Sequence, residues 1–102
     1  EEIRVALFNT KCRLLREITI SRGTVNASLL TPREVFLTAL RHQAVYVVLI
    51  HNHPSGDPSP SREDIDLTRR MKQAGELLEI PVVDHIIIGD HRYISLREKG
   101  IL

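Results

Sequence analysis

The hydrophobic positions along the chain follow two spacings, one typical of strands and the other typical of amphipathic helices. β-Branched and apolar residues dominate positions 3–8 and 14–20, and the polar residues between these segments predict a hairpin. Positions 25–30 could add a short third strand. Near the end of the chain, the apolar segments 82–88 and 93–96 predict two more strands joined by a polar turn.

One segment is apolar almost throughout and is expected to lie deepest in the sheet. Residues 46–50 are typical of a central strand that is covered on both faces. Residues 51–60 contain three prolines together with glycine and serine, so we expect a loop without regular structure. The central strand should therefore lead directly into this loop.

Two helices are predicted from their capping patterns. Thr31-Pro32-Arg33-Glu34 offers a cap residue, a proline in the first turn and a glutamate that can reach back, which predicts a helix over 32–42. Ser61-Arg62-Glu63-Asp64 has the cap pattern for a second helix that runs to about residue 78. The apolar stripe of the second helix is formed by Leu67, Met71, Ala74 and Leu78.

The composition and charge are those of an ordinary globular protein. The chain has 102 residues, 42% of them hydrophobic and 26% charged, which predicts a single domain over 1–102 with its own core. Fourteen Lys and Arg residues against 13 Asp and Glu residues give no broad electrostatic reason to bind nucleic acid or an anionic membrane. The predicted elements form an α/β domain, in which two main helices flank a mixed sheet.

The cysteine content and the apolar runs bear on where the protein is found. Cys12 is the single cysteine, which excludes an intramolecular disulfide and is typical of a reducing compartment. The longest apolar run, 44–50, is far shorter than the roughly 20 residues that cross a bilayer. We therefore expect a cytoplasmic protein without a membrane span. Because the chain lacks an initiator methionine, we also expect it to be part of a longer protein.

The candidate chemistry is concentrated in His51, His53 and Asp64. Side chains alternate along an extended chain, so the two histidines share a face at the end of the central strand. Asp64 lies at the edge of the apolar stripe, so its carboxylate is expected to face the sheet. Two imidazoles and one carboxylate are ligands that zinc prefers, and three protein ligands leave the fourth position open for water. The alternative is a pair of surface histidines at the end of a strand, beside a proline that forms a turn.

These residues resemble a known motif. His51-Asn52-His53-Pro54, followed by Ser61 and Asp64, resembles the JAMM motif of the MPN domain metalloproteases. Asn52 stands where many of these proteases have serine or threonine. With asparagine at this position, the chain more closely resembles the bacterial RadC family. The resemblance implies a mixed-sheet fold of the JAMM type, similar to that of the cytidine deaminases.

The likeness to the RadC family extends over nearly the whole chain, from the first strand to about Gly100. It includes Pro32-Arg33-Glu34, the run His51-Asn52-His53-Pro54-Ser55-Gly56 and the pair Asp84-His85. The resemblance implies that this domain is the C-terminal part of a longer RadC-like chain.

The resemblance also implies a role for each site residue. The zinc ligands would be His51, His53 and Asp64, and Ser61 would hydrogen-bond the oxyanion of the tetrahedral intermediate. The general base of the family is a glutamate on the first strand, which corresponds here to Glu1, with Glu2 as its rival. Strand parity places Glu1 with the apolar Ile3, Val5 and Leu7, and this favours Glu1. Ser61 and Asp64 also fit a simple helix cap, and the two roles are compatible.

Asp84 and His85 are polar residues inside a strongly apolar strand. An unpaired charge there would be costly, so each is expected to have a hydrogen-bonding partner. They could orient a residue that binds the metal without binding the metal themselves, or they could form a structural pair.

Three classes of function remain open from the sequence. The first is a zinc-dependent metallopeptidase or isopeptidase that acts on an unidentified protein or peptide substrate. The second is a DNA-associated module, because RadC proteins have been called DNA repair proteins, although nothing in these 102 residues supports nucleic-acid binding. The third is a non-catalytic interaction domain, and the presence of all three ligand residues counts against it.

Overall fold

Residues 1–23 and 30–102 are described by the computed structural model, and within them the chain forms five strands and two helices. The elements are β1 (Glu2–Phe8), β2 (Leu14–Arg22), α1 (Pro32–Arg41), β3 (Tyr46–Asn52), α2 (Arg62–Leu78), β4 (Val82–Ile88) and β5 (Tyr93–Ser95). The strands and helices predicted in these residues are all present, with ends that differ by at most two residues. The short strand expected over 25–30 falls almost wholly on 24–29, outside the described residues.

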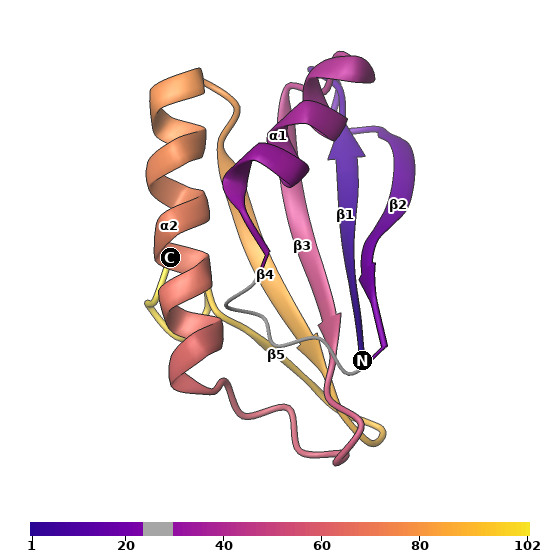
Figure 1. Cartoon of the computed structure of the whole chain (residues 1–102), viewed down its shortest axis with the longest axis vertical. Coiled ribbons are helices and arrows are strands. Elements are labelled where there is room, and N and C mark those ends of the chain that lie inside the picture. Colours follow the sequence, from indigo (N-terminus) through magenta and orange to yellow (C-terminus); the bar gives the residue numbers. More distant parts are fainter. Residues whose placement is uncertain (24–29) are drawn as a thin grey trace.

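The strands form one mixed sheet in the order β2-β1-β3-β4-β5 (Figure 1). β3 and β4 are parallel, whereas the other neighbouring pairs are antiparallel. The all-apolar segment therefore lies in the centre of the sheet, as its sequence predicts. The register places Ile3 opposite His51 and Leu49 opposite His85.

Both helices pack on the same face of this sheet (Figure 1). β2, β3 and β4 all run in the same direction, and each helix connects one of these strands to the next across the sheet. Right-handed crossovers that progress in one direction place their helices on one side. The described part of the chain is therefore a two-layer α/β domain.

The hydrophobic core lies between the helices and this face of the sheet. It takes alternate residues from the strands and the inner faces of both helices, because side chains alternate along a strand. Its buried members include Ile3, Val5, Leu7, Val35, Phe36, Ala39, Val47, Leu49, Leu67 and Met71. Full burial of each large apolar side chain contributes roughly 1.5–3 kcal/mol to folding.

The prediction that the central strand is covered on both faces is wrong for the described residues. Tyr46, Val48 and Ile50 are only half-buried, because both helices pack against the opposite face. Neighbouring side chains provide part of the cover, and Phe8 stacks on Tyr46 with ring centroids 4.8 Å apart.

The apolar stripe of α2 also ends earlier than predicted. Leu78 is 46% exposed, although the other stripe residues are buried or pack against the core. The helix instead brings its backbone close to the core at Gly75, where a Cβ would lie 2.6 Å from the carbonyl oxygen of Ile80. The last turn therefore has no space beneath it that a leucine could fill.

The two predicted helix caps form in different ways. At α2, the Ser61 hydroxyl accepts the Asp64 N–H and the Asp64 carboxylate accepts the Ser61 N–H, which completes the predicted capping box. At α1, the Thr31 hydroxyl donates to the Glu34 carboxylate and caps no backbone N–H. Glu34 therefore reaches back to a side chain and not to the backbone.

The predicted start of the loop is wrong by two residues. His51 and Asn52 belong to β3, where they pair with β4, and His51 also pairs with β1. β3 extends past its apolar residues because backbone hydrogen bonds to the neighbouring strands do not depend on the type of side chain. This extension matters because it places His51 within the sheet and not on a loop.

Candidate metal centre

His51, His53 and Asp64 converge at the end of β3 and the beginning of α2. One potential ligand atom from each residue can be chosen so that all three lie within 4.8 Å of one another. His53 Nε2 lies 2.9 Å from Asp64 Oδ2, and His51 Nδ1 lies 3.4 Å from Asp64 Oδ1. Two ligands of one tetrahedral zinc ion are roughly 3.3–3.6 Å apart, since zinc–ligand bonds are about 2.0–2.2 Å. The three side chains are therefore placed to bind a metal ion.

The secondary structure explains why these side chains meet. His51 follows Leu49 on the helix-facing side of β3, and it is completely buried. His53 lies one residue beyond the strand end and remains on the same side, as the spacing of two predicts. Asp64 is 1% exposed and its carboxylate is held in place by the capping box of α2. The same aspartate thus caps the helix and faces both histidines.

The hydrogen bonds of His53 determine which of its ring nitrogens carries a proton. Nδ1 lies 2.9 Å from the carbonyl oxygen of Asp57, and a carbonyl can only accept, so Nδ1 donates. In the neutral ring, Nε2 then presents a lone pair to the carboxylate of Asp64 at 2.9 Å. Two acceptors at this distance require a positive charge between them or a proton on Nε2. A bound metal ion would supply that charge, and the Asp57 carbonyl holds the ring in the orientation that such an ion needs.

His51 contacts a carboxylate on each side. Its Nε2 hydrogen-bonds the Glu1 carboxylate, whereas its Nδ1 is buried and has no hydrogen-bond partner among the described residues. A buried polar atom without a partner typically costs about 1–3 kcal/mol. The unpartnered nitrogen and the donor set of two imidazoles and one carboxylate both fit a zinc ion.

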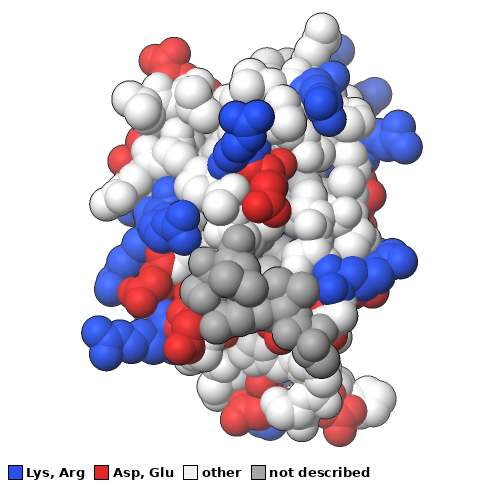
Figure 2. Space-filling view, in the orientation of Figure 1, with Lys and Arg blue, Asp and Glu red and all other residues white. Residues whose placement is uncertain are grey.

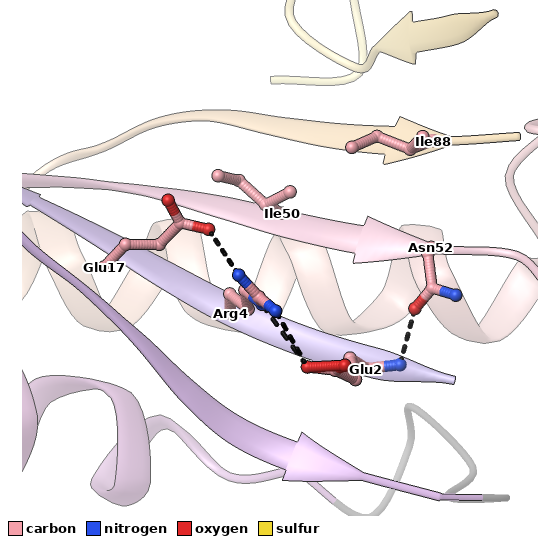
Figure 3. Close-up of a pocket in the computed structure, with 6 residues that line it drawn as sticks. All are labelled: Glu2, Arg4, Glu17, Ile50, Asn52 and Ile88. Atoms are coloured by element: carbon pink, nitrogen blue, oxygen red, sulfur yellow. Dashed lines mark hydrogen bonds and ion pairs between the residues drawn. The ribbon is translucent and has the colours of Figure 1, made fainter. Parts of the chain in front are cut away.

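The two candidate glutamates lie on opposite faces of the sheet. Glu1 lies on the helix-facing side, beside His51, and keeps 25% of its side chain exposed. Glu2 lies on the other face, where its carboxylate pairs with Arg4 at 3.3 Å (Figure 3). The geometry therefore brings Glu1 to the candidate metal centre and keeps Glu2 away from it.

Asn52 connects the two strands that carry these residues. Its side-chain oxygen accepts the backbone N–H of Glu2 at 2.6 Å (Figure 3). This bond ties the start of β1 to the end of β3, and so holds Glu1 next to His51. Asn52 also lines a shallow cavity of about 200 Å³ on the face of the sheet opposite the helices, together with Glu2, Arg4, Glu17, Ile50 and Ile88. The sequence shows Asn52 between the two histidines, but its contact with β1 depends on the register of the strands, which the sequence does not show.

The loop that carries His53 packs on the turn between β4 and β5. The His53 N–H donates to the Ile88 carbonyl at 2.9 Å, and the Asp90 N–H donates to the Gly56 carbonyl at 2.7 Å. Within the loop, the backbone and hydroxyl of Ser59 both donate to Asp57, and these bonds lower the pKa of the Asp57 carboxyl. The loop is therefore an ordered support for His53.

Gly89 makes the close packing of this loop possible. A Cβ at this position would overlap the carbonyl oxygen of Gly56 and lie 2.7 Å from Cδ of Pro58. We expect Gly89→Ala to displace the loop and to lower the affinity for a divalent metal ion by about tenfold or more, since His53 would lose its support. Competition with a chromophoric chelator measures this affinity. Arg92→Ala, an exposed change in the same turn, is the control and should leave the affinity unchanged; equal affinities for both variants would contradict the expectation.

Behind the candidate metal centre, His85 and Thr68 form a buried pair. His85 is completely buried on β4, and its ring stacks on that of His51 with centroids 5.7 Å apart. Its Nδ1 lies 2.7 Å from the hydroxyl of Thr68 on α2. Burial, together with the nearby His51, lowers the pKa of His85 to about 4, so its ring is neutral at neutral pH.

Asp84 lies on the opposite side of β4 and does not pair with the His85 side chain. Its carboxylate accepts the Ser95 hydroxyl at 2.6 Å and the backbone N–H of Arg97 at 3.1 Å. It also accepts the backbone N–H of His85 at 2.7 Å. Both residues thus have the hydrogen-bonding partners predicted for them. Only His85 adjoins the candidate metal centre. Of the two alternatives, a pair formed by the two side chains is excluded, because successive residues of a strand face opposite sides.

Charged side chains of both signs are interspersed over the helical side of the molecule (Figure 2). The described residues include no helix of the length and apolar character needed to cross a bilayer.

A mixed sheet whose central strand delivers two histidines, opposite an aspartate from the following helix, has the JAMM-like arrangement of ligands. The chain belongs to the RadC-like JAB domain family, whose model matches residues 1–101. It is also similar over its full length to proteins named UPF0758, with 52% identity to that of Syntrophotalea carbinolica, 53% to that of Desulforamulus reducens and 54% to that of Desulfitobacterium hafniense DCB-2. The chain spans 45% of the length of each of these relatives.

Proposed function

We propose that this domain is a zinc-dependent hydrolase of peptide or isopeptide bonds. The observation that carries the proposal is the arrangement of acceptors around Asp64. His53 uses Nδ1 to donate to a carbonyl and places Nε2 2.9 Å from the carboxylate, and among the described residues the buried Nδ1 of His51 has no hydrogen-bond partner. A divalent cation would satisfy all three side chains, and the membership of the chain in the RadC-like JAB domain family supports this proposal.

In this proposal His51, His53 and Asp64 hold the zinc ion. When bound, zinc would act as a Lewis acid, which polarises a carbonyl group and makes a water molecule acidic enough to lose a proton near neutral pH. Glu1 is the general base: its carboxylate takes a proton from water and passes it to the leaving amine. Its position beside His51 and its partial exposure suit this task.

Ser61 has a place in the same proposal. Its hydroxyl oxygen accepts the Asp64 N–H at 3.1 Å, so its own proton is still available for donation. The hydroxyl would donate this proton in a hydrogen bond to the oxyanion that forms on the substrate carbonyl. Capping and catalysis are compatible, because one hydroxyl can accept and donate at the same time.

The substrate would approach from the exposed side of the centre. His53 keeps 16% of its side chain accessible and Glu1 keeps 25%, whereas His51 and Asp64 are buried. A main-chain amide or a lysine-linked amide fits a centre with one accessible side and a general base next to it. A protein or peptide is therefore the proposed substrate class.

The proposal is tested by metal binding followed by a cleavage screen. The purified protein should bind one zinc ion per chain, and libraries of peptides and isopeptides should be cleaved in a manner that a chelator abolishes. His53→Ala is the control and should lose both properties. A protein that binds no zinc at micromolar concentration would overturn the proposal. Zinc binding without cleavage of any library member would instead support a non-catalytic interaction domain.

A further inference from the structure

The zinc ligands come from two separate elements, so their relative placement depends on what ties α2 to the sheet. His51 and His53 belong to β3 and the loop after it, whereas Asp64 belongs to the first turn of α2. Among the residues that the structure describes, Thr68–His85 is the one side-chain hydrogen bond that joins α2 to a strand. Both side chains are completely buried.

The direction of this hydrogen bond follows from the number of protons. The Thr68 hydroxyl lies 2.7 Å from the carbonyl oxygen of Asp64, one turn earlier in α2, and donates its single proton to it. The same hydroxyl lies 2.7 Å from Nδ1 of His85, so it must accept a proton there. His85 is thereby fixed with a proton on Nδ1. Its Nε2 then carries no proton, which agrees with its being buried without a hydrogen-bond partner in residues 1–23 and 30–102.

This chain of bonds reaches the metal centre at two points. Through Thr68 it ends on the backbone of Asp64, and through the ring of His85 it packs on His51, with an interplanar angle of 24°. Asp84 anchors the backbone at His85 by accepting its N–H. The ligand from α2 and a ligand from β3 are thus both braced by one residue of β4.

We propose that Thr68 and His85 are positioning residues of the metal centre, which set the distance between Asp64 and the two histidines. The inference rests on the proposed zinc site, but it concerns the assembly of that site and not the reaction. Neither residue contacts the metal or the substrate in this proposal. Their effect is on zinc affinity, because ligands that are not already held in place must be ordered when the ion binds, and this ordering costs free energy.

Two variants separate the hydrogen bond from simple packing. Thr68→Val keeps the shape of the side chain and removes the hydroxyl, whereas Thr68→Ser keeps the hydroxyl and removes the methyl group. We expect Thr68→Val to bind zinc about ten- to a hundredfold more weakly than wild type, and Thr68→Ser to stay close to wild type. Competition titration of zinc alone against a chromophoric chelator measures the affinity. Unfolding of the metal-free variants in denaturant reports the purely structural cost.

The outcomes are distinct. Equal affinities for wild type and both variants would overturn the inference and leave the proposed function intact, and so would equal losses in both variants. A wild-type protein that binds no zinc would overturn the proposed function and this inference together. Nitrogen NMR of wild type gives an independent result should Thr68→Val fail to fold: the inference requires His85 protonated on Nδ1, and a proton on Nε2 alone would overturn it.

Discussion

Asp64→Asn is expected to lower the zinc affinity by a factor on the order of 100 or more. The variant keeps the size of the side chain, and its amide oxygen can still accept the Ser61 N–H, so the cap of α2 survives. It removes the negative charge that would balance a zinc ion held by the two histidines. Isothermal titration of the metal-free protein with zinc measures the loss.

The matched control for this prediction lies on the same helix. Asp66 is exposed, two residues after Asp64, and Asp66→Asn removes the same charge without touching the centre. We expect its zinc affinity to equal that of wild type. If Asp66→Asn and Asp64→Asn lose affinity to the same extent, general electrostatics and not ligation would explain the effect.

Glu1→Gln is expected to retain zinc and to lose hydrolysis. Removal of a general base typically costs about 10² to 10⁴ in rate, and glutamine cannot take a proton from water. The measurement is the turnover of a substrate found in the cleavage screen, with the zinc content of each preparation determined in parallel. An unchanged turnover would remove Glu1 from the reaction.

Glu2→Gln is the control for Glu1→Gln, because the adjacent carboxylate lies on the other face of the sheet, paired with Arg4. Its turnover should match that of wild type. A third result would give Glu1 another role: if Glu1→Gln binds zinc tenfold or more weakly, its carboxylate orients the His51 ring as a hydrogen-bond partner. The contact between Glu1 and His51 Nε2 makes this comparison decisive.

Local patterns were sufficient to predict the elements and the candidate ligands. The capping box at Ser61 and the spacing of His51 and His53 depend on residues a few positions apart, so the sequence displays them directly. Strand parity also favoured Glu1 over Glu2, because alternation along β1 follows from the backbone alone. Predictions of burial were wrong where burial depends on other elements of the fold, as at Leu78.

The sequence by itself determined the order of strands and helices, the central position of the apolar strand, and the residue types at the candidate metal centre. Only the tertiary structure decided that both helices share one face, that Asn52 ties β3 to β1, and that His85 bonds Thr68 and stacks on His51. The physical reason is distance along the chain. Contacts within a turn or a strand follow from backbone periodicity, whereas contacts between residues 17 or 50 positions apart depend on register and packing of the whole sheet.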